Sequence, residues 1–187
     1  LTVKRFCLQD CLKHSAVPKE MFKAVLKAKP FDCEEDAIEA VISRKIQPGD
    51  AVFIRYEGPK GSGMPEMFYT TEAISSDPEL GKTIALITDG RFSGASKGPA
   101  IGHVSPEAAD GGPIALVEED DLIRIDIPER VLEIIGVKGE ELPKEEIGRI
   151  LAERKKAWKP MPPKYTKGVL KIFSEHAVSP MKGGYMV

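Results

Sequence analysis

Residues 82–105 read K-T-I-A-L-I-T-D-G-R-F-S-G-A-S-K-G-P-A-I-G-H-V-S, an apolar run that passes directly into a glycine-rich loop. The run Lys82–Thr88 predicts a buried strand, because it is short, apolar and followed by turn residues. An earlier stretch repeats this arrangement: Ala51–Tyr56 predicts a strand, and residues 57–66 (E-G-P-K-G-S-G-M-P-E) form another glycine-rich loop. Such loops let backbone N–H groups approach a small ligand closely. We therefore expect the function of the chain to lie in these two loops.

The rest of the pattern predicts a strand-dominated middle with helices at both ends. Further strands are expected at Pro113–Val117, Leu122–Ile127 and Val131–Ile135. Helices are expected within Pro18–Lys29, from the capping pair Asp32 and Glu35 to Pro48, within Met64–Ile74, from Ser105-Pro106-Glu107, over Lys144–Trp158 and around Lys167–Ser174. The connections are too short for helical crossovers throughout. This favours an α/β fold with a mixed, partly closed barrel-like sheet and flanking helices over a doubly wound sheet.

Composition limits the class of protein. The chain has 187 residues, 42% of them apolar and 30% charged, which is typical of a globular domain. A formal net charge of -2 argues against nucleic acid as a partner, since binding phosphates requires a basic excess. No apolar run approaches the roughly 20 residues that span a bilayer. The start, L-T-V-K-R-F-C, has neither a signal peptide nor an initiator Met, so we expect a cytoplasmic piece of a longer protein.

Cysteine and histidine do not form a recognisable metal motif. Their positions are Cys7, Cys11, Cys33, His14, His103 and His176. An odd number of cysteines without a secretory signal indicates reduced thiols, and the usual spacings of a zinc site are missing. We expect no metal site built from these residues.

Ser93 is the candidate for chemistry in the loop after residue 88. It stands between Gly90 and Gly94, where neighbouring N–H groups can stabilise an alkoxide and make the hydroxyl a stronger base or nucleophile. The loop is not a G-x-S-x-G hydrolase elbow, because Arg91 occupies the position of the first glycine. From residue types alone, a serine that only satisfies turn backbone is the more common case, since serine is a frequent turn residue. His103, ten residues further on, is either a polar loop residue or a substrate contact.

Glu66 is the candidate in the loop after residue 56. A carboxylate that faces a glycine-rich loop is a suitable ligand for magnesium, and an acid in the first turn of a helix is also favoured by the helix dipole. Glu57 is open to the same metal-binding role or to a pairing with Arg55. Neither loop contains a nucleotide-binding glycine motif in the right form.

Three stretches in order carry a family resemblance: G-P-K-G-S-G-M-P-E-M at 58–67, A-L-I-T-D-G-R-F-S-G at 85–94, and G-H-V-S-P-E-A-A-D-G-G-P-I-A-L-V-E at 102–118. Together with the segments that precede them, they resemble the dihydroxy-acid dehydratase and 6-phosphogluconate dehydratase family over about residues 30–130. The resemblance implies that 1–187 is the C-terminal, swivelling β/β/α domain of such an enzyme, without its larger N-terminal domain. Within it, 1–30 is expected to be a lead-in and 143–187 a helical appendage.

The resemblance also implies a reaction, the removal of water from a 2,3-dihydroxy acid to give a 2-keto acid. It assigns Ser93 as the base and Glu66 as a ligand of Mg²⁺. The iron–sulfur cluster is expected in the N-terminal domain, so the cysteines of this chain do not bind it. We expect substrate contacts from the residues that follow the base and from the later histidine: Gly94, Ala95, Ser96 and His103.

The substrate and the assembly stay open at this point. The segment S-G-A-S at 93–96 replaces the common S-G-G-T, and the loop at 58–64 is shortened relative to the branched-chain pathway enzyme. A branched-chain dihydroxy acid, a sugar acid and a phosphorylated sugar acid all remain candidates. The expected partners are the N-terminal domain and the acid substrate, in a homodimer of the full-length protein. The alternative is a stand-alone binding module that has the fold but not the catalysis.

Overall fold

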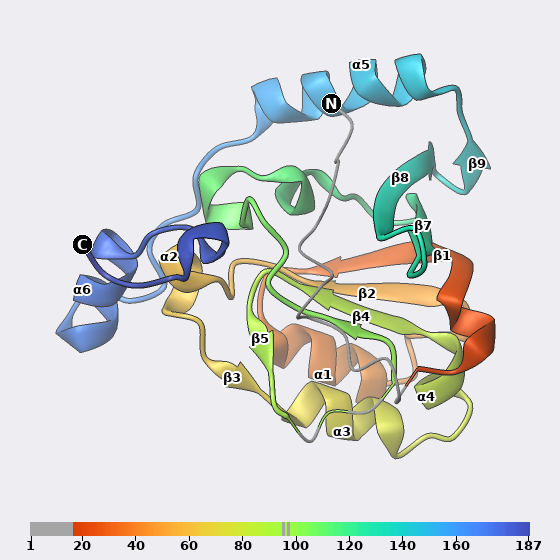
Figure 1. Cartoon of the computed structure of the whole chain (residues 1–187), viewed down its shortest axis with the longest axis horizontal. Coiled ribbons are helices and arrows are strands. Elements are labelled where there is room, and N and C mark those ends of the chain that lie inside the picture. Colours follow the sequence, from red (N-terminus) through yellow and green to blue (C-terminus); the bar gives the residue numbers. More distant parts are fainter. Residues whose placement is uncertain (1–16, 95, 97) are drawn as a thin grey trace.

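The computed structural model describes residues 17–94, 96 and 98–187, and its central element is a mixed seven-stranded sheet (Figure 1). The strands run in the order β6-β4-β2-β1-β7-β8-β9. Their bounds are β1 (Lys23–Phe31), β2 (Asp50–Ile54), β4 (Ala85–Thr88), β6 (Ala100–Ile101), β7 (Leu122–Asp126), β8 (Val131–Val137) and β9 (Glu140–Glu141). The first four are parallel to one another, and β7, β8 and β9 continue the sheet antiparallel from β1. In this parallel half, the carboxyl ends of neighbouring strands lie at the same edge of the sheet.

The parallel strands are buried on both faces, which explains their continuous apolar sequences. Successive residues of β2 enter different cores: Ala51 and Phe53 pack in one, while Val52 and Ile54 pack in the other. The second core is closed by α1 (Glu34–Ile42), α3 (Tyr69–Ser75) and α4 (Leu80–Thr83), which lie under the sheet in Figure 1. The first core is closed by residues 104–117, which include two 3₁₀ turns, η3 (Ala108–Asp110) and η4 (Pro113–Leu116).

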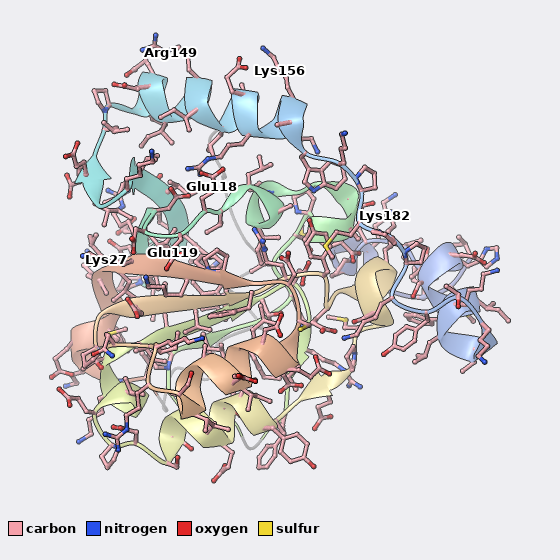
Figure 2. The ribbon with its side chains drawn as sticks, turned by 180° about the vertical axis from the view of Figure 1, so that it is seen from behind. Lys27, Glu118, Glu119, Arg149, Lys156 and Lys182 are labelled. Carbon is pink, nitrogen blue, oxygen red and sulfur yellow. The ribbon has the colours of Figure 1, made fainter. Side chains whose placement is uncertain are left out.

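Helix α5 (Lys144–Ala157) covers η4 and β8 with one face only. Ile147 and Leu151 pack in a small cluster with Leu116. In Figure 2, Arg149 and Lys156 point away from the body on the outer face of the helix. This division into one apolar and one charged face is what the amphipathic pattern of 144–158 predicts.

Several short elements lie within the glycine-rich loops or next to them. Helix α2 (Pro59–Ser62) lies within the first loop, and β3 (Glu66–Met67) pairs with β5 (Arg91–Phe92) in a two-stranded parallel ribbon. The C-terminal lobe, residues 160–187, contains α6 (Gly168–His176) and the 3₁₀ turn η5 (Pro180–Lys182). It is placed at the edge of the molecule next to α2 (Figure 1).

The helix expected within Pro18–Lys29 is wrong. Only a 3₁₀ turn, η2 (Lys19–Phe22), is present, and β1 follows it. Leu26 and Ala28 are buried while Lys27 is exposed and Lys29 is half-buried, so the two-residue period of a strand was the informative signal. Lysine and alanine, which favour helices in isolation, obscured it.

Four other expectations need correction. Pro113–Val117 is not a strand but contains η4, and Met64–Ile74 is divided between β3 and α3. The turn at 105–107 precedes a 3₁₀ helix that begins only at Ala108. Asp32 does not cap α1, because Cys33 occupies the N-cap position and the Asp32 carboxylate binds Arg55 instead.

The predicted mixed α/β fold is confirmed, but the barrel-like closure is not found. In the described ranges, β6 and β9 are the two edges of the large sheet and do not pair with each other. The swivelling motion that the resemblance implies remains a prediction. Among the helices of the described residues, none has the length and apolar character needed to cross a membrane.

Candidate functional site

The two glycine-rich loops leave the sheet at the same edge. Strands β2 and β4 are adjacent and parallel, with Ile54 paired to Thr88, so the loops that follow them begin side by side. Strand β6 ends there too, because the N–H of His103 donates to the carbonyl of Gly90 at 2.8 Å. The carboxyl ends of parallel strands are the usual position of ligand sites in such sheets. The topology therefore brings the predicted site residues to one end of the molecule.

Glu66 and Ser93 meet on the ribbon formed by β3 and β5. Glu66 pairs in register with Arg91, and the N–H of Ser93 donates to the carbonyl of Met67 at 3.1 Å. Met67 is fully buried and Phe92 packs against the second core. Because side chains alternate along a strand, Glu66 and Arg91 occupy the opposite, outer side of the ribbon, and Ser93 follows directly after β5. The structure thus places Glu66 on the ribbon and Ser93 at its end, two positions after the partner of Glu66.

The surroundings of Glu66 suit a hard cation ligand. Its side chain is 52% exposed, and its Oε2 lies 3.9 Å from Nη1 of Arg91, which is itself held by a 2.9 Å bond from Nε to the Met64 carbonyl. A hydrated carboxylate oxygen of this kind is a typical Mg²⁺ ligand. No group of three or more acidic, histidine or cysteine side chains in the described ranges is arranged to hold a metal. Among the described residues, Glu66 is therefore a candidate for a single ligand and not part of a complete metal site.

The expected substrate contacts divide into two groups. Gly94 is exposed directly after Ser93, and Ser96 donates its N–H to the Ser93 carbonyl at 3.0 Å and its hydroxyl to Thr71 of α3 at 3.3 Å. His103 is half-buried with φ of 54°, at the other end of the loop. Ala95 lies outside the described residues. The structure thus ties the serine loop to α3 and places His103 beside the turn at Gly90.

Of the cysteines, only Cys33 lies within the described residues, and it is a free thiol, as expected. Burial raises the pKa of this thiol above its ordinary value. Cys7 and Cys11 lie outside the described residues.

Three carboxylates, Glu57, Asp89 and Glu107, are buried beneath the two loops, and sequence reasoning missed the last two. Asp89 accepts three backbone N–H groups, from Tyr56 at 3.2 Å, Glu57 at 3.0 Å and Ala108 at 2.8 Å. It therefore joins the starts of both glycine-rich loops to the segment after β6. Burial raises the pKa of Asp89 to about 6.

Glu107 holds the first loop from below. Its Oε2 accepts the N–H groups of Lys60 at 3.0 Å and Gly61 at 3.1 Å. A Cβ on Gly58 would lie 2.5 Å from this oxygen, so the close approach requires glycine. Burial, with the negative charge of Asp89 as a second cause, raises the pKa of Glu107 to about 7. Its Oε1 is buried without a hydrogen-bond partner among the described residues. Glu107 thus fixes the shape of the loop that leads to Glu66.

Glu57 takes neither of the roles considered for it. The Ser62 hydroxyl donates to its Oε2 at 2.5 Å, and Lys164 of the C-terminal lobe donates to its Oε1 at 2.8 Å. Arg55 pairs with Asp32 instead. The side chain of Glu57 is 1% exposed, which removes it from a hydrated metal site. The signal available in the sequence was an acid directly after a buried strand and before a glycine, a pattern that Glu57 and Asp89 share.

Comparison with known proteins identifies the same family that the motifs at 58–67, 85–94 and 102–118 resemble. Residues 8–184 match the family model described as the dihydroxy-acid/6-phosphogluconate dehydratase C-terminal domain. A protein from Agathobacter rectalis named dihydroxy-acid dehydratase is 53% identical over 176 residues, which is 94% of this chain and 30% of the relative. Proteins of the same name from Pyrococcus abyssi and Ignicoccus hospitalis are 51% and 47% identical over 92% of the chain.

The chain spans about 30% of the length of these relatives. Both kinds of match cover nearly all of the sequence and agree with the position of the motifs in the two loops. The chain belongs to the dihydroxy-acid/6-phosphogluconate dehydratase family and corresponds to its C-terminal domain.

Proposed function

We propose that this chain is the C-terminal domain of a hydro-lyase that converts a 2,3-dihydroxy acid into a 2-keto acid, with Ser93 as the base and Glu66 as a ligand of Mg²⁺. The observation that supports the proposal is the ribbon of β3 and β5, which carries Glu66 on its outer side and leads directly into Ser93. The names of the relatives favour a dihydroxy acid as the substrate.

Ser93 would remove the proton from C2 of the substrate. The C2–H bond breaks, the hydroxyl leaves C3 as water after it gains a proton, and the resulting enol tautomerises to the 2-keto acid. Ser93 is half-buried and Gly94 beside it has no side chain, so a small acid can reach the hydroxyl. Mg²⁺, together with an iron–sulfur cluster held by the N-terminal domain, would supply the Lewis acidity that stabilises the developing negative charge and assists loss of the C3 hydroxyl.

Glu66 and its neighbours would organise the metal side of the site. The carboxylate is exposed and its distance to Arg91 is long for an ion pair, so it can exchange this contact for a cation at little cost. Asp89 and Glu107 would not touch the substrate. Their bonds to the backbone of the two loops hold the ribbon in place relative to the sheet.

Replacement of Ser93 by alanine in the full-length enzyme tests the proposal. Loss of general base catalysis typically costs about 10²–10⁴-fold in rate, so kcat should fall by that order while the binding of a dihydroxy acid is retained. Ser76→Ala, an exposed serine at the end of α3, is the matched control and should have wild-type kinetics. Wild-type kcat in Ser93→Ala would remove Ser93 from the role of base.

A further inference from the structure

Exposed large hydrophobic side chains are concentrated in the C-terminal lobe. Twelve large hydrophobic side chains are exposed in the described residues, and seven of these lie in the last 20 positions. These seven are Val169, Leu170, Ile172, Met181, Tyr185, Met186 and Val187. Single exposed hydrophobic residues are ordinary, but a concentration of this kind marks an interaction surface.

Helix α6 has one broad apolar face, and only one edge of it faces this chain. A Cβ built on Gly63 would lie 3.0 Å from Cδ2 of Leu170 and 3.6 Å from Cδ1 of Phe173, so these two side chains cover the end of the first glycine-rich loop. Val169 and Ile172, at i,i+3 spacing, continue this face away from the body and are 73% and 53% exposed. Not one residue of α6 is buried. The helix contacts the site with one side and leaves the other uncovered.

The lobe is also packed loosely on the body. A cavity of about 490 Å³ lies between them, lined by Tyr56 and Lys60 on the body and by Met161, Lys164 and Lys171 in the lobe. The ion pair of Lys164 with buried Glu57, at 2.8 Å, ties the segment before α6 to the first loop. Figure 2 shows α6 standing at the margin of the molecule. The lobe is thus attached to the body through the segment before α6, and the outer side of α6 is an exposed apolar face.

We propose that this outer side of α6, together with the exposed tail from Met181 to Val187, is the surface on which the N-terminal part of the same dehydratase packs. The inference rests on the proposed function, because it takes the chain to be one part of a longer enzyme. The relatives are more than three times as long as this chain, so most of such an enzyme lies outside it. That missing part is therefore the largest available source of apolar surface to cover the lobe.

Continuity with the candidate site favours this occupant over a second copy of the chain. The described residues provide a single candidate magnesium ligand, Glu66, so the rest of the metal site must come from elsewhere. Leu170 and Phe173 contact the loop that leads to Glu66, which puts α6 next to the place where a metal-bearing domain has to approach. A domain that completes the metal site is thus positioned to cover α6 as well.

Hydrogen exchange tests the proposal without reliance on turnover. Backbone amides of α6 should exchange at least about tenfold more slowly in the full-length enzyme than in the 187-residue chain, because docking suppresses local opening. Ile172→Asp should abolish the slowing. Ile42→Asp is the matched control: Ile42 is 72% exposed, lies on α1 and should leave the exchange of α6 unchanged.

The outcomes separate the two proposals. Equal exchange of α6 in both proteins would overturn the docking proposal, whatever the activity of Ser93→Ala. An Ile172-dependent dimer of the 187-residue chain, measured by sedimentation, would assign the surface to a second copy and would also overturn it. Slowed exchange in an enzyme whose Ser93→Ala variant is fully active would support docking and remove the proposed role of Ser93.

Discussion

Glu107 is a buried acid that holds the first glycine-rich loop in place. Its side chain is fully buried, one oxygen binds two N–H groups of the first glycine-rich loop, and the other has no hydrogen-bond partner among the described residues. An ionised carboxylate is costly in this position, which is why its pKa is raised to about 7. The structure of the loop is therefore linked to a proton that the folded chain binds more tightly than the unfolded chain.

This linkage predicts how stability depends on pH. The pKa of Glu107 is raised from 4.5 to about 7, so between these values the folded state binds more protons than the unfolded state. The contribution of Glu107 to stability is then present below about pH 4.5 and is lost as the pH rises to about 7, by on the order of 3 kcal/mol.

Glu107→Gln should remove this dependence. The free energy of unfolding of the wild-type chain, relative to the variant, should be lower at pH 8 than at pH 5, as measured by urea denaturation. Asp89, whose pKa is raised to about 6, is present in both proteins and its effect is expected to cancel largely in the comparison. A stability difference that is the same at both pH values would contradict the assignment.

Helix α5 and the longer strands of the sheet could be predicted from the sequence, whereas the shortest strands could not. The apolar period of 3.6 predicts α5 and the period of 2 predicts β7, while short apolar runs predict β2 and β8, all to within a few residues. β3, β5 and β6 have two residues each and carry no periodic signal, so they were missed. They form only because the loops that contain them start side by side.

The candidate site shows the same division. Ser93 and Glu66 could be selected from the sequence, because each is in a glycine-rich loop with a recognisable motif. The roles of Asp89 and Glu107 could not, since their partners are backbone groups as far as 47 positions away in the sequence. Such contacts depend on the register of the parallel strands, which the sequence pattern does not specify.

A buried ion pair adds to the apolar packing that attaches α5. Nη1 and Nη2 of Arg154 bind the carboxylate of Asp121 at 2.5 Å and 2.9 Å, and Nη1 also binds the Leu116 carbonyl at 3.0 Å. Asp121 is fully buried, so removal of the guanidinium would leave an unpaired charge. Arg154→Met should therefore lower the free energy of unfolding by about 3–5 kcal/mol in urea denaturation.

Lys156→Met is the control on the same helix. Its ion pair with Glu153 is exposed, since both side chains are more than 70% accessible, and Figure 2 shows Lys156 pointing to solvent. The expected change is small, because exposed pairs of this kind contribute little. Equal decreases in the free energy of unfolding of the two variants would contradict a larger contribution from the buried ion pair.

Taken as a whole, the molecule is a folded domain with the candidate site residues toward one side of its sheet. Both loops, the ribbon and the C-terminal lobe lie toward one side of the sheet (Figure 1), and that side carries the single candidate magnesium ligand and the exposed apolar face of α6. The opposite end of the sheet has short turns and charged side chains such as Lys27 and Glu119 (Figure 2). The asymmetry agrees with a domain that functions against the N-terminal part of a dehydratase.

The dependence of activity on Mg²⁺ in the full-length enzyme tests the central claim most directly. Glu66→Gln removes the carboxylate from the ribbon, and Glu72→Gln removes an equally charged, exposed carboxylate from α3. The account predicts that the Mg²⁺ concentration for half-maximal activity rises at least about tenfold in Glu66→Gln and is unchanged in Glu72→Gln. The same Mg²⁺ dependence in both variants and the wild type would contradict it.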